Sequence, residues 1–500
     1  MKKFRLYFLL IFLAELLSFS EFLFPELRQV AFFTILIIAL ILSLQKLEYG
    51  LLILLAELFI GSKGYLFYFE QGGFIISIRI ALFLVVMAVW LAKLIILWSK
   101  QGLAGAIEKL RLPFWQYYIL LGAAIGWGIV NGYFNGNEFS NVFFDANSWL
   151  YWLIIFPLAY ALNERSKNGN KFWQELFAVF SAAVIWLCLE TLFLLFAFSH
   201  NLIIALYELY PWIRITGAGE VTVMESDFVR IFFQSQIYAL IALMIFTSLI
   251  VYFKSAGDKK KLLYCCIAIL LSTSAVIISF SRSFWIGLAA GLLFYCFIFF
   301  LYFKQNWKEL FWQVSVLFSI AALSVLLIFA IVKFPYPKPT ANFDLSLLTE
   351  RASSISGEAG ASSRWNLLPP LWEKIKQAPI LGQGFGATVT YKTQDPRVLE
   401  QNPSGEYTTY AFEWGYLDIW LKLGLLGLAV YLILLVKIFY NGIKNFQFSI
   451  PRTRDNFQSL LNIALLAGLV TIMTTSFFSP YLNHPLGIGY VVLLSILLKK

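Results

Sequence analysis

Residues 312–333 read WQVSVLFSIAALSVLLIFAIVK, and this stretch decides the fold. It holds no charged residue before Lys333, and an α-helix needs about 20 such apolar residues to cross a bilayer. The whole chain has the same character, because 60% of its 500 residues are hydrophobic and 13% are charged. Soluble domains contain about half apolar and about a quarter charged residues. The sequence therefore predicts a bundle of membrane helices and excludes soluble, disordered, collagen-like and disulfide-scaffold proteins.

About fourteen stretches of this kind occur along the chain. They cover 6–24, 29–45, 48–61, 74–98, 115–133, 149–163, 172–199, 234–253, 262–280, 284–303, 312–333, 412–440, 457–478 and 485–498. The third, the sixth and the last are short for a bilayer, so we expect about 12–14 spans. We predict an all-α polytopic membrane helix bundle with one large extracytoplasmic loop that carries short amphipathic helices.

Three regions follow from this layout. Residues 1–333 form a transmembrane bundle of about 11 spans, with an outer loop at 200–233. Residues 334–411 form the large extracytoplasmic loop. Residues 412–500 form the C-terminal transmembrane helices, about 3 spans.

The basic residues orient the bundle, because cytoplasmic loops of membrane proteins are enriched in Lys and Arg. Strict alternation of fourteen spans from a cytoplasmic N-terminus puts 21 Lys and Arg residues in cytoplasmic loops and 5 in short outer loops. The outer ones are Arg28, Lys63, Arg214, Arg230 and Arg282. We therefore predict that both termini are cytoplasmic. The net charge of +10 then reflects membrane orientation, and we expect no nucleic-acid partner.

The large loop, residues 334–411, begins with two linker-like segments, FPYPKPT and SSISGEAGASS. The next segment, RWNLLPPLWEKIKQAP, predicts a short amphipathic helix on the membrane surface or across the end of the bundle. Its apolar residues at helical spacing are Trp365, Leu368, Leu371, Trp372 and Ile375. The loop holds as many acidic as basic residues, so it is no polybasic docking arm. A loop of this length in a compact protein is more often functional than idle.

Several familiar kinds of site are absent from the sequence. The glycine segment GQGFG (382–386) follows an amphipathic helix and not a buried strand, so we interpret it as a structural turn and not as a phosphate-binding fingerprint. The four cysteines fall inside predicted spans and are interpreted as packing residues. No acidic cluster has metal-ligand spacing. We therefore predict neither a metal nor a cofactor.

Three arginines are candidates for binding phosphate. Arg282 lies in ISFSRSFWIG at the predicted outer boundary, where an arginine either snorkels to lipid head groups or pairs with a fixed partner. A guanidinium matches phosphate oxygens, so Arg282, flanked by Ser281 and Ser283, can equally clamp a phosphate. Arg364 opens the predicted loop helix and Arg230 begins the eighth span. A surface charge and a snorkelling side chain are the simpler interpretations of these two, but together the three arginines would suit a lipid diphosphate.

Two acids begin the twelfth predicted span. Asp418 and Lys422 are spaced i, i+4, so they can pair on one helix face, which favours a structural role. Glu413 has no such partner in its own helix, and a carboxylate in a partly desolvated site suits a general base or acid. An interfacial charge in water is the alternative. His484, in SPYLNHPLG, lies between two spans and could face the same cavity.

In three stretches the chain resembles the O-antigen ligase/O-antigen polymerase family of polytopic membrane glycosyltransferases. The stretches are SRSFWIG (281–287), SSRWNLLPPLWEKIKQAPILGQGFG (362–386) and EWGYLDIWLKLGLLGL (413–428). They occur in order around one large outer loop. Members of the ligase branch carry a histidine where this chain has Glu413, and an acid is common where it has Lys422. The resemblance leaves polymerase and ligase both open.

The resemblance implies transfer of a glycan from an undecaprenyl-diphosphate carrier to an acceptor hydroxyl, at the outer face of the cytoplasmic (inner) membrane of a bacterium. The implied acceptor is a glycan or another lipid, and the implied mechanism is metal-independent and inverting. Arg282, Arg364 and Arg230 would bind the diphosphate, and Glu413 would be the base. Ser281, Tyr416 and His484 are possible additional site residues. The carrier's tail would contact membrane lipid.

Two other classes of function stay open at this point. A lipid-linked oligosaccharide flippase or another multi-span transporter can have a similar number of spans. A transporter would gather its polar residues in a cavity near the membrane midplane between two related halves, whereas a transferase would gather them beside the large loop. A non-catalytic envelope scaffold is the third interpretation.

Overall fold

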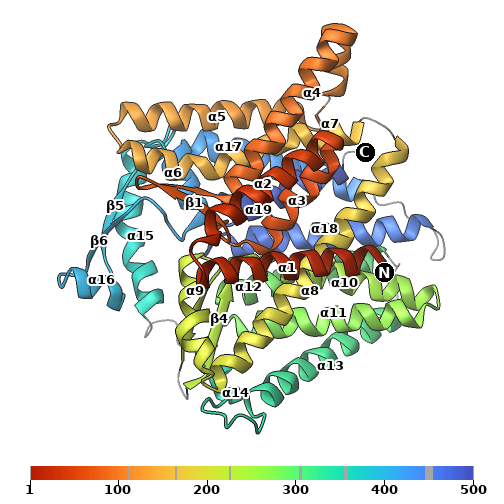
Figure 1. Cartoon of the computed structure of the whole chain (residues 1–500), viewed down its shortest axis with the longest axis vertical. Helices are drawn as coiled ribbons and strands as arrows, with labels where there is room; N and C mark the ends of the chain where they lie inside the picture. The colour runs from red at the N-terminus through yellow and green to blue at the C-terminus, as the bar shows by residue number, and fades with distance from the viewer. Residues whose placement is uncertain are drawn as a thin grey trace.

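The computed structural model describes residues 2–110, 112–163, 166–224, 227–302, 307–353, 359–444 and 454–498. Within these ranges, twelve helical segments are long and apolar enough to cross a membrane. They run back and forth in one bundle (Figure 1). The prediction of an all-α polytopic membrane helix bundle is therefore confirmed.

The spanning segments involve thirteen helices, because one span is divided. They are α1 (Lys2–Leu23), α2 (Leu27–Gln45), α4 (Ile78–Lys109), α5 (Trp115–Phe134), α6 (Phe139–Leu150) with α7 (Ile155–Asn163), α8 (Ser166–Ser199), α10 (Ile237–Ser255), α11 (Lys259–Ile278), α12 (Arg282–Tyr302), α13 (Trp307–Val332), α17 (Gly415–Lys444) and α18 (Arg454–Thr475). A 3₁₀ turn, η1 (Tyr151–Ile154), joins α6 to α7.

Two predicted spans are short helices in the structure. α3 (Leu47–Ile60) has 14 residues and α19 (Pro485–Leu497) has 13. At about 1.5 Å per residue each is roughly 20 Å long, which is less than the ~30 Å hydrocarbon core of a bilayer. These two account for the difference between fourteen predicted stretches and the twelve long helices.

Helix α10 forms the centre of the bundle. All residues from Ile237 to Val251 are buried, and the helix packs against α8, α11 and α18. A helix that is apolar on every side is stable only where protein or lipid surrounds it completely. By contrast, only 17% of an 18-residue apolar stretch of α13 is buried in the protein. Most of the surface of this helix is therefore left for lipid.

Three short antiparallel hairpins lie outside the spanning segments. They are β1 (Tyr68–Gln71) with β2 (Phe74–Ser77), β3 (Gly219–Val223) with β4 (Val229–Phe233), and β5 (Val389–Lys392) with β6 (Glu406–Thr409). The outer segment before β3 also contains a π-helical turn, η2 (Ala205–Leu209), and α9 (Tyr210–Ile215), while η4 (Gln234–Gln236) leads from β4 into α10. The sequence analysis did not predict these elements.

The large loop contains α14 (Leu345–Ser353), α15 (Ala359–Gln377), the β5–β6 hairpin and α16 (Pro396–Gln401). Helix α15 is the predicted amphipathic helix, but it starts earlier and buries a different stripe, with Leu367 buried and the predicted Leu368 half-buried. Leu367, Leu371 and Ile375 are buried against Phe412 and the hairpin. Trp365 and Trp372 are 51% and 43% exposed. The loop helix therefore packs on its own small core and turns its tryptophans outward.

The glycine turn after α15 inserts between α5 and α17. Its amides at Gln383 and Gly384 donate to the carbonyls of Leu421 and Lys422, at 2.6 and 3.1 Å. Those carbonyls are accessible because α17 is interrupted at Gly424, where φ is 69°. Gly384 also has a φ of 79°, and a Cβ there would lie 2.0 Å from the backbone nitrogen of Gly132. The turn is thus structural, as predicted, and it fastens the loop to the bundle.

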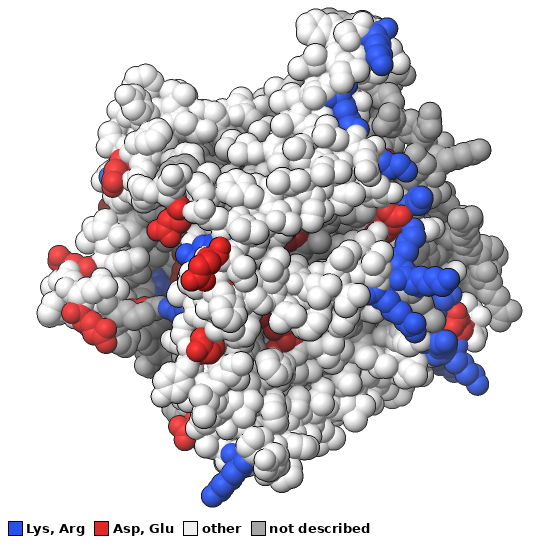
Figure 2. Space-filling view, viewed as in Figure 1, with Lys and Arg blue, Asp and Glu red and all other residues white. Residues whose placement is uncertain are grey.

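The two ends of the bundle differ in content. Both chain termini lie at one end, and α15, α16 and the β5–β6 hairpin lie at the opposite end (Figure 1). In the same view, most of the visible Lys and Arg side chains gather at the end that holds the termini, and most Asp and Glu side chains lie toward the other end (Figure 2). This arrangement agrees with the charge asymmetry on which the predicted orientation rests.

Candidate functional site

The turn between α11 and α12 carries Arg282 in the first position of α12. Both neighbouring serines are buried, and the Oγ atoms of Ser281 and Ser283 lie 3.1 Å apart. The Ser283 hydroxyl also lies 3.1 Å from the hydroxyl of Ser479, in the segment between α18 and α19. Phe280 turns the chain here with a φ of 46°. The Arg282 side chain is half-buried. Because Ser281 and Ser283 on either side of it are buried, the backbone at Arg282 is held in place.

Two more arginines contact this turn from outside the membrane helices. Arg230, on β4, donates from Nε to the carbonyl of Ser279 at 2.7 Å. Arg351, on α14, donates from Nε to the carbonyl of Phe280 at 3.2 Å. We call Arg230, Arg282 and Arg351 the arginine cluster. The Nε atoms of Arg230 and Arg351 thus contact adjacent carbonyls of the turn that bears Arg282.

Arg364 and Glu413 form the second part of the site. Arg364, on α15, donates from Nε to the carboxylate of Glu413, which lies two residues before α17 begins. Their side chains are 35% and 52% exposed. The Trp414 indole donates to the Arg364 carbonyl at 3.0 Å, which joins the two segments a second time. Glu413 thus has a cationic partner, although none in its own helix, as the sequence indicated.

The segment between α18 and α19 connects the two parts. Ser479 contacts Ser283 beside Arg282, as described above, while the ring of its neighbour Phe478 lies 5.7 Å from the ring of Trp414 beside Glu413. Residues from three distant stretches of sequence therefore meet around one short segment. The structure brings the Arg282 turn and the Arg364–Glu413 pair to this segment, and a cavity shared by the two guanidiniums stays a prediction.

A buried charge network begins at Asp418, five residues after Glu413. Lys422 Nζ lies 2.5 Å from Asp418 Oδ1 and 2.6 Å from Asp145 Oδ1, and the Lys422 and Asp418 side chains are each 2% exposed. The Asn483 amide donates to Asp418, and Asp145 Oδ2 accepts from the amide of Gly386 at 2.9 Å. The predicted Asp418–Lys422 pair is confirmed. Its third member, Asp145, ties α6 and the glycine turn to α17.

Tyr416 and His484 make structural contacts. The Tyr416 hydroxyl donates to the carbonyl of Met473 at 2.9 Å and so joins α17 to α18. His484 Nδ1 accepts from the amide of Leu486 at the start of α19. Burial, assisted by the charges of Arg79 and Lys63, lowers the pKa of His484 to about 3. A neutral histidine of this kind is a weak base, and catalytic roles for both residues stay predictions.

Sequence reasoning missed Arg351 and Asp145. Arg351 was one of many charges that balance across the large loop, and its only signal was a helical segment, DLSLLTERAS, that precedes the linker. Asp145 lies in a span where a carboxylate requires a partner. In the part of the chain that the structure describes, no group of three or more His, Cys, Asp or Glu residues could hold a metal ion.

Comparison with known proteins identifies one stretch of the chain. The family model for O-Antigen ligase matches residues 267–432, a range that contains Arg282, Arg351, Arg364 and Glu413 but not Arg230. A comparison with curated proteins gives no match, and a comparison with solved structures gives none either. The chain is therefore a multi-pass membrane protein whose residues 267–432 are similar to the O-antigen ligase family.

Proposed function

We propose that this protein transfers a glycan from an undecaprenyl-diphosphate carrier to an acceptor hydroxyl at the outer face of the cytoplasmic membrane. The observation that carries the proposal is the arginine cluster within and beside the family domain. Two of its guanidiniums contact adjacent carbonyls of the turn that bears the third. A diphosphate needs more than one cationic donor, because it leaves with about two negative charges in a poorly solvated site.

The reaction is an inverting displacement in which the protein supplies charge and a base. The acceptor oxygen forms a bond to the anomeric carbon of the donor sugar while its proton passes to a carboxylate oxygen of Glu413. The bond from that carbon to the carrier diphosphate breaks, and the electron pair leaves on the diphosphate oxygen. Arg282, Arg230 and Arg351 stabilise this oxygen and its neighbours, so the proposed mechanism requires no metal ion.

Arg364 positions the base. Its Nε contacts the Glu413 carboxylate, and its backbone carbonyl accepts from Trp414, so the loop helix holds the carboxylate at the start of α17. About half of the Glu413 side chain is exposed, which leaves an oxygen accessible to an acceptor hydroxyl. Ser281 lies in the same turn as Arg282 and supports the arginine through its contact with Ser283.

The proposed orientation places both termini in the cytoplasm and the large loop outside. Arg230 and Arg351 lie on segments outside the membrane helices, so the cluster lies at the loop end of the bundle, where a transferase and not a transporter would place it. Cysteine labelling tests the orientation. A cysteine at Glu400, on α16, should react with an impermeant maleimide in intact cells, and labelling only after the membrane is opened would reverse the assignment.

The direct test is glycan transfer by purified protein in nanodiscs that contain a lipid-linked glycan donor. Arg282→Lys keeps the charge but loses the planar fork, so transfer should fall by about 10-fold or more. Arg214 is exposed on α9, and Arg214→Lys is the matched control, expected to retain wild-type transfer. Equal activity of the two variants would remove the diphosphate role of Arg282. In a deletion strain, single repeat units on the carrier would indicate a polymerase, and full-length chains on the carrier would indicate a ligase.

A further inference from the structure

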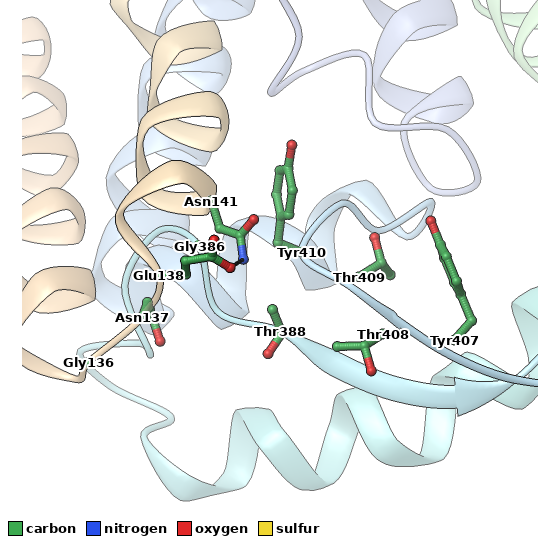
Figure 3. Close-up of a pocket in the computed structure, with 10 residues that line it drawn as sticks. All are labelled: Gly136, Asn137, Glu138, Asn141, Gly386, Thr388, Tyr407, Thr408, Thr409 and Tyr410. Atoms are coloured by element: carbon green, nitrogen blue, oxygen red, sulfur yellow. Dashed lines mark hydrogen bonds between the residues drawn. The ribbon is translucent and has the colours of Figure 1, made fainter. Parts of the chain in front are cut away.

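A pocket of about 540 Å³ lies beside the segment that leads to Glu413. One wall is formed by Asn137 and Glu138, in the turn between α5 and α6, and by Asn141 in the first turn of α6 (Figure 3). The opposite wall holds Tyr407, on β6, and Tyr410, just after it. Thr388 lies between these walls, just after the glycine turn. The volume of the pocket is in the range of small-molecule binding sites, about 300–1,000 Å³.

The chemistry of this lining excludes the diphosphate. None of the described residues that line it is Lys or Arg, and Glu138 adds a negative charge. The Glu138 carboxylate accepts from Ser140 Oγ at 2.7 Å and from Asn141 Nδ2 at 3.3 Å, which fixes its direction. Amides, hydroxyls, a carboxylate and tyrosine rings can bind a ligand that has many hydroxyls and an apolar ring face. A sugar has this combination, and the carboxylate favours an uncharged sugar over an acidic one.

The pocket is also held rigidly. The amide of Gly386, which lines it, donates to Asp145 of the buried network. Asn137 Nδ2 donates to the Phe385 carbonyl at 2.8 Å, so the α5–α6 turn and the glycine turn are joined. Burial and the nearby Asp145 carboxylate raise the pKa of Tyr410, so its hydroxyl stays protonated and can donate. A rigid site binds without first ordering its own side chains.

The position of the pocket assigns its ligand. Tyr410 precedes Glu413 by three residues, so their Cα atoms lie within about 11 Å of each other. Tyr407 packs on Tyr391 with ring centroids 6.0 Å apart. Tyr391 is close enough to Arg364 for an electrostatic interaction between the two side chains. We propose that this pocket binds an uncharged sugar unit of the acceptor, which makes the acceptor a glycan and brings its hydroxyl to Glu413. This inference rests on the proposed function, because it assumes that Glu413 takes the acceptor proton.

The test measures transfer to a soluble acceptor. The acceptor is the oligosaccharide released by mild acid from the lipid-linked glycan of the producing cells and then labelled with a fluorophore. The protein is the full chain in nanodiscs with saturating lipid-linked donor. Asn141→Ala and Glu138→Gln should each raise the KM for this acceptor about 10-fold, with kcat and the KM for donor unchanged. Glu400→Gln, an exposed acid on α16 outside the pocket lining, is the matched control and should behave as wild type.

A second measurement separates the two proposals. Saturation-transfer NMR with the unlabelled oligosaccharide measures binding without chemistry, and the signal should weaken in Asn141→Ala but persist in Glu400→Gln. Binding through the pocket by a wild-type protein that transfers nothing would overturn the proposed function and support the pocket. Normal transfer and binding by both pocket variants would overturn the pocket assignment and leave the proposed function intact. A rise in donor KM alone would show that the pocket does not hold the acceptor.

Discussion

Two ion pairs near the start of α17 have the same chemistry and opposite surroundings. Asp418 and Lys422 are each 2% exposed, and Lys422 also pairs with Asp145. Glu413 is 52% exposed and pairs with Arg364, which is 35% exposed. The two acids lie less than two helical turns apart in sequence, so the difference arises from packing against distant segments. The glycine turn and α6 close around the first pair, whereas the second lies at the edge of the loop.

This difference in burial suits the first pair to stabilising the fold and the second pair to taking part in a reaction. A buried charge that loses its partner is strongly destabilising, so the Asp418–Lys422–Asp145 network has little freedom to take part in a reaction. An exposed pair contributes about 0–1 kcal/mol to stability. Glu413 can therefore accept a substrate proton, which weakens its ion pair with Arg364, without loss of the fold. The account therefore predicts that substitutions in the first pair affect folding and that substitutions in the second affect turnover.

The largest effect on stability should come from Lys422→Met. The change leaves Asp145 and Asp418 buried without a cation, and it should destabilise the protein by about 3–5 kcal/mol. Thermal unfolding in detergent measures this loss. Lys376→Met is the matched control, because Lys376 pairs with Glu373 on the exposed side of α15, and it should change stability by less than about 1 kcal/mol. Equal melting of the two variants would contradict the structural role of the network.

His484 lies next to Asn483, which donates to Asp418. Burial of His484 should make the stability of this region depend on pH. Its pKa of about 3 in the folded protein lies below the ~6.5 of a free histidine. The unfolded state therefore binds the proton first, so this stability is full above about pH 6.5 and is lost as pH falls toward 3. His484→Asn keeps a side chain that can accept from Leu486. It should abolish about 1–2 kcal/mol of the acid destabilisation between pH 7 and pH 5.

Denaturation of both proteins at several pH values measures that difference. Parallel stability curves for the wild type and His484→Asn would show that the pKa of His484 is the same in the folded and unfolded states, and would contradict its burial in the neutral form. The pH dependence of transfer should be the same in both proteins, because a neutral histidine that caps α19 is not the base.

Tyr416→Phe should have a smaller effect. The substitution removes one hydrogen bond, from the hydroxyl to the Met473 carbonyl, and should cost about 1 kcal/mol. Turnover per folded molecule should stay within about twofold of wild type. A large fall in turnover with unchanged stability would instead assign Tyr416 to the chemistry.

The smallest effect on stability should come from Glu413→Gln. Loss of one exposed ion pair should change the free energy of unfolding by less than about 1 kcal/mol. The same unfolding assay measures it, beside Lys422→Met on the same helix. A destabilisation as large as that of Lys422→Met would show that Glu413 is a structural residue and would remove the contrast between the two pairs.

The spans could be predicted from the sequence, because a bilayer demands a length and an apolar composition that few other structures need. The Asp418–Lys422 pair could be predicted because helix geometry alone brings i and i+4 together. The hairpins could not, since strands of 4 or 5 residues are too short to show a clear alternation. The buried stripe of α15, which includes Leu367, was missed because the tryptophans fit an apolar helix face as well as the leucines do.

The candidate site was only partly predictable for a related reason. Arg282, Arg364 and Glu413 stand in recognisable motifs, but Arg351 is an ordinary loop charge until α14 brings it to the Phe280 carbonyl. Asp145, on α6, and Lys422, on α17, are brought together only by the tertiary fold. No local pattern predicts a contact between residues so far apart, so these parts of the site required the tertiary structure.

The central claim is that Glu413 takes the acceptor proton, and transfer by Glu413→Gln tests it most directly. Glutamine keeps the size of the side chain but removes the basic oxygen. With purified protein in nanodiscs and lipid-linked donor, the rate should fall by about 10²- to 10⁴-fold, while the melting temperature stays at the wild-type value. A wild-type rate of transfer by folded Glu413→Gln would contradict the account.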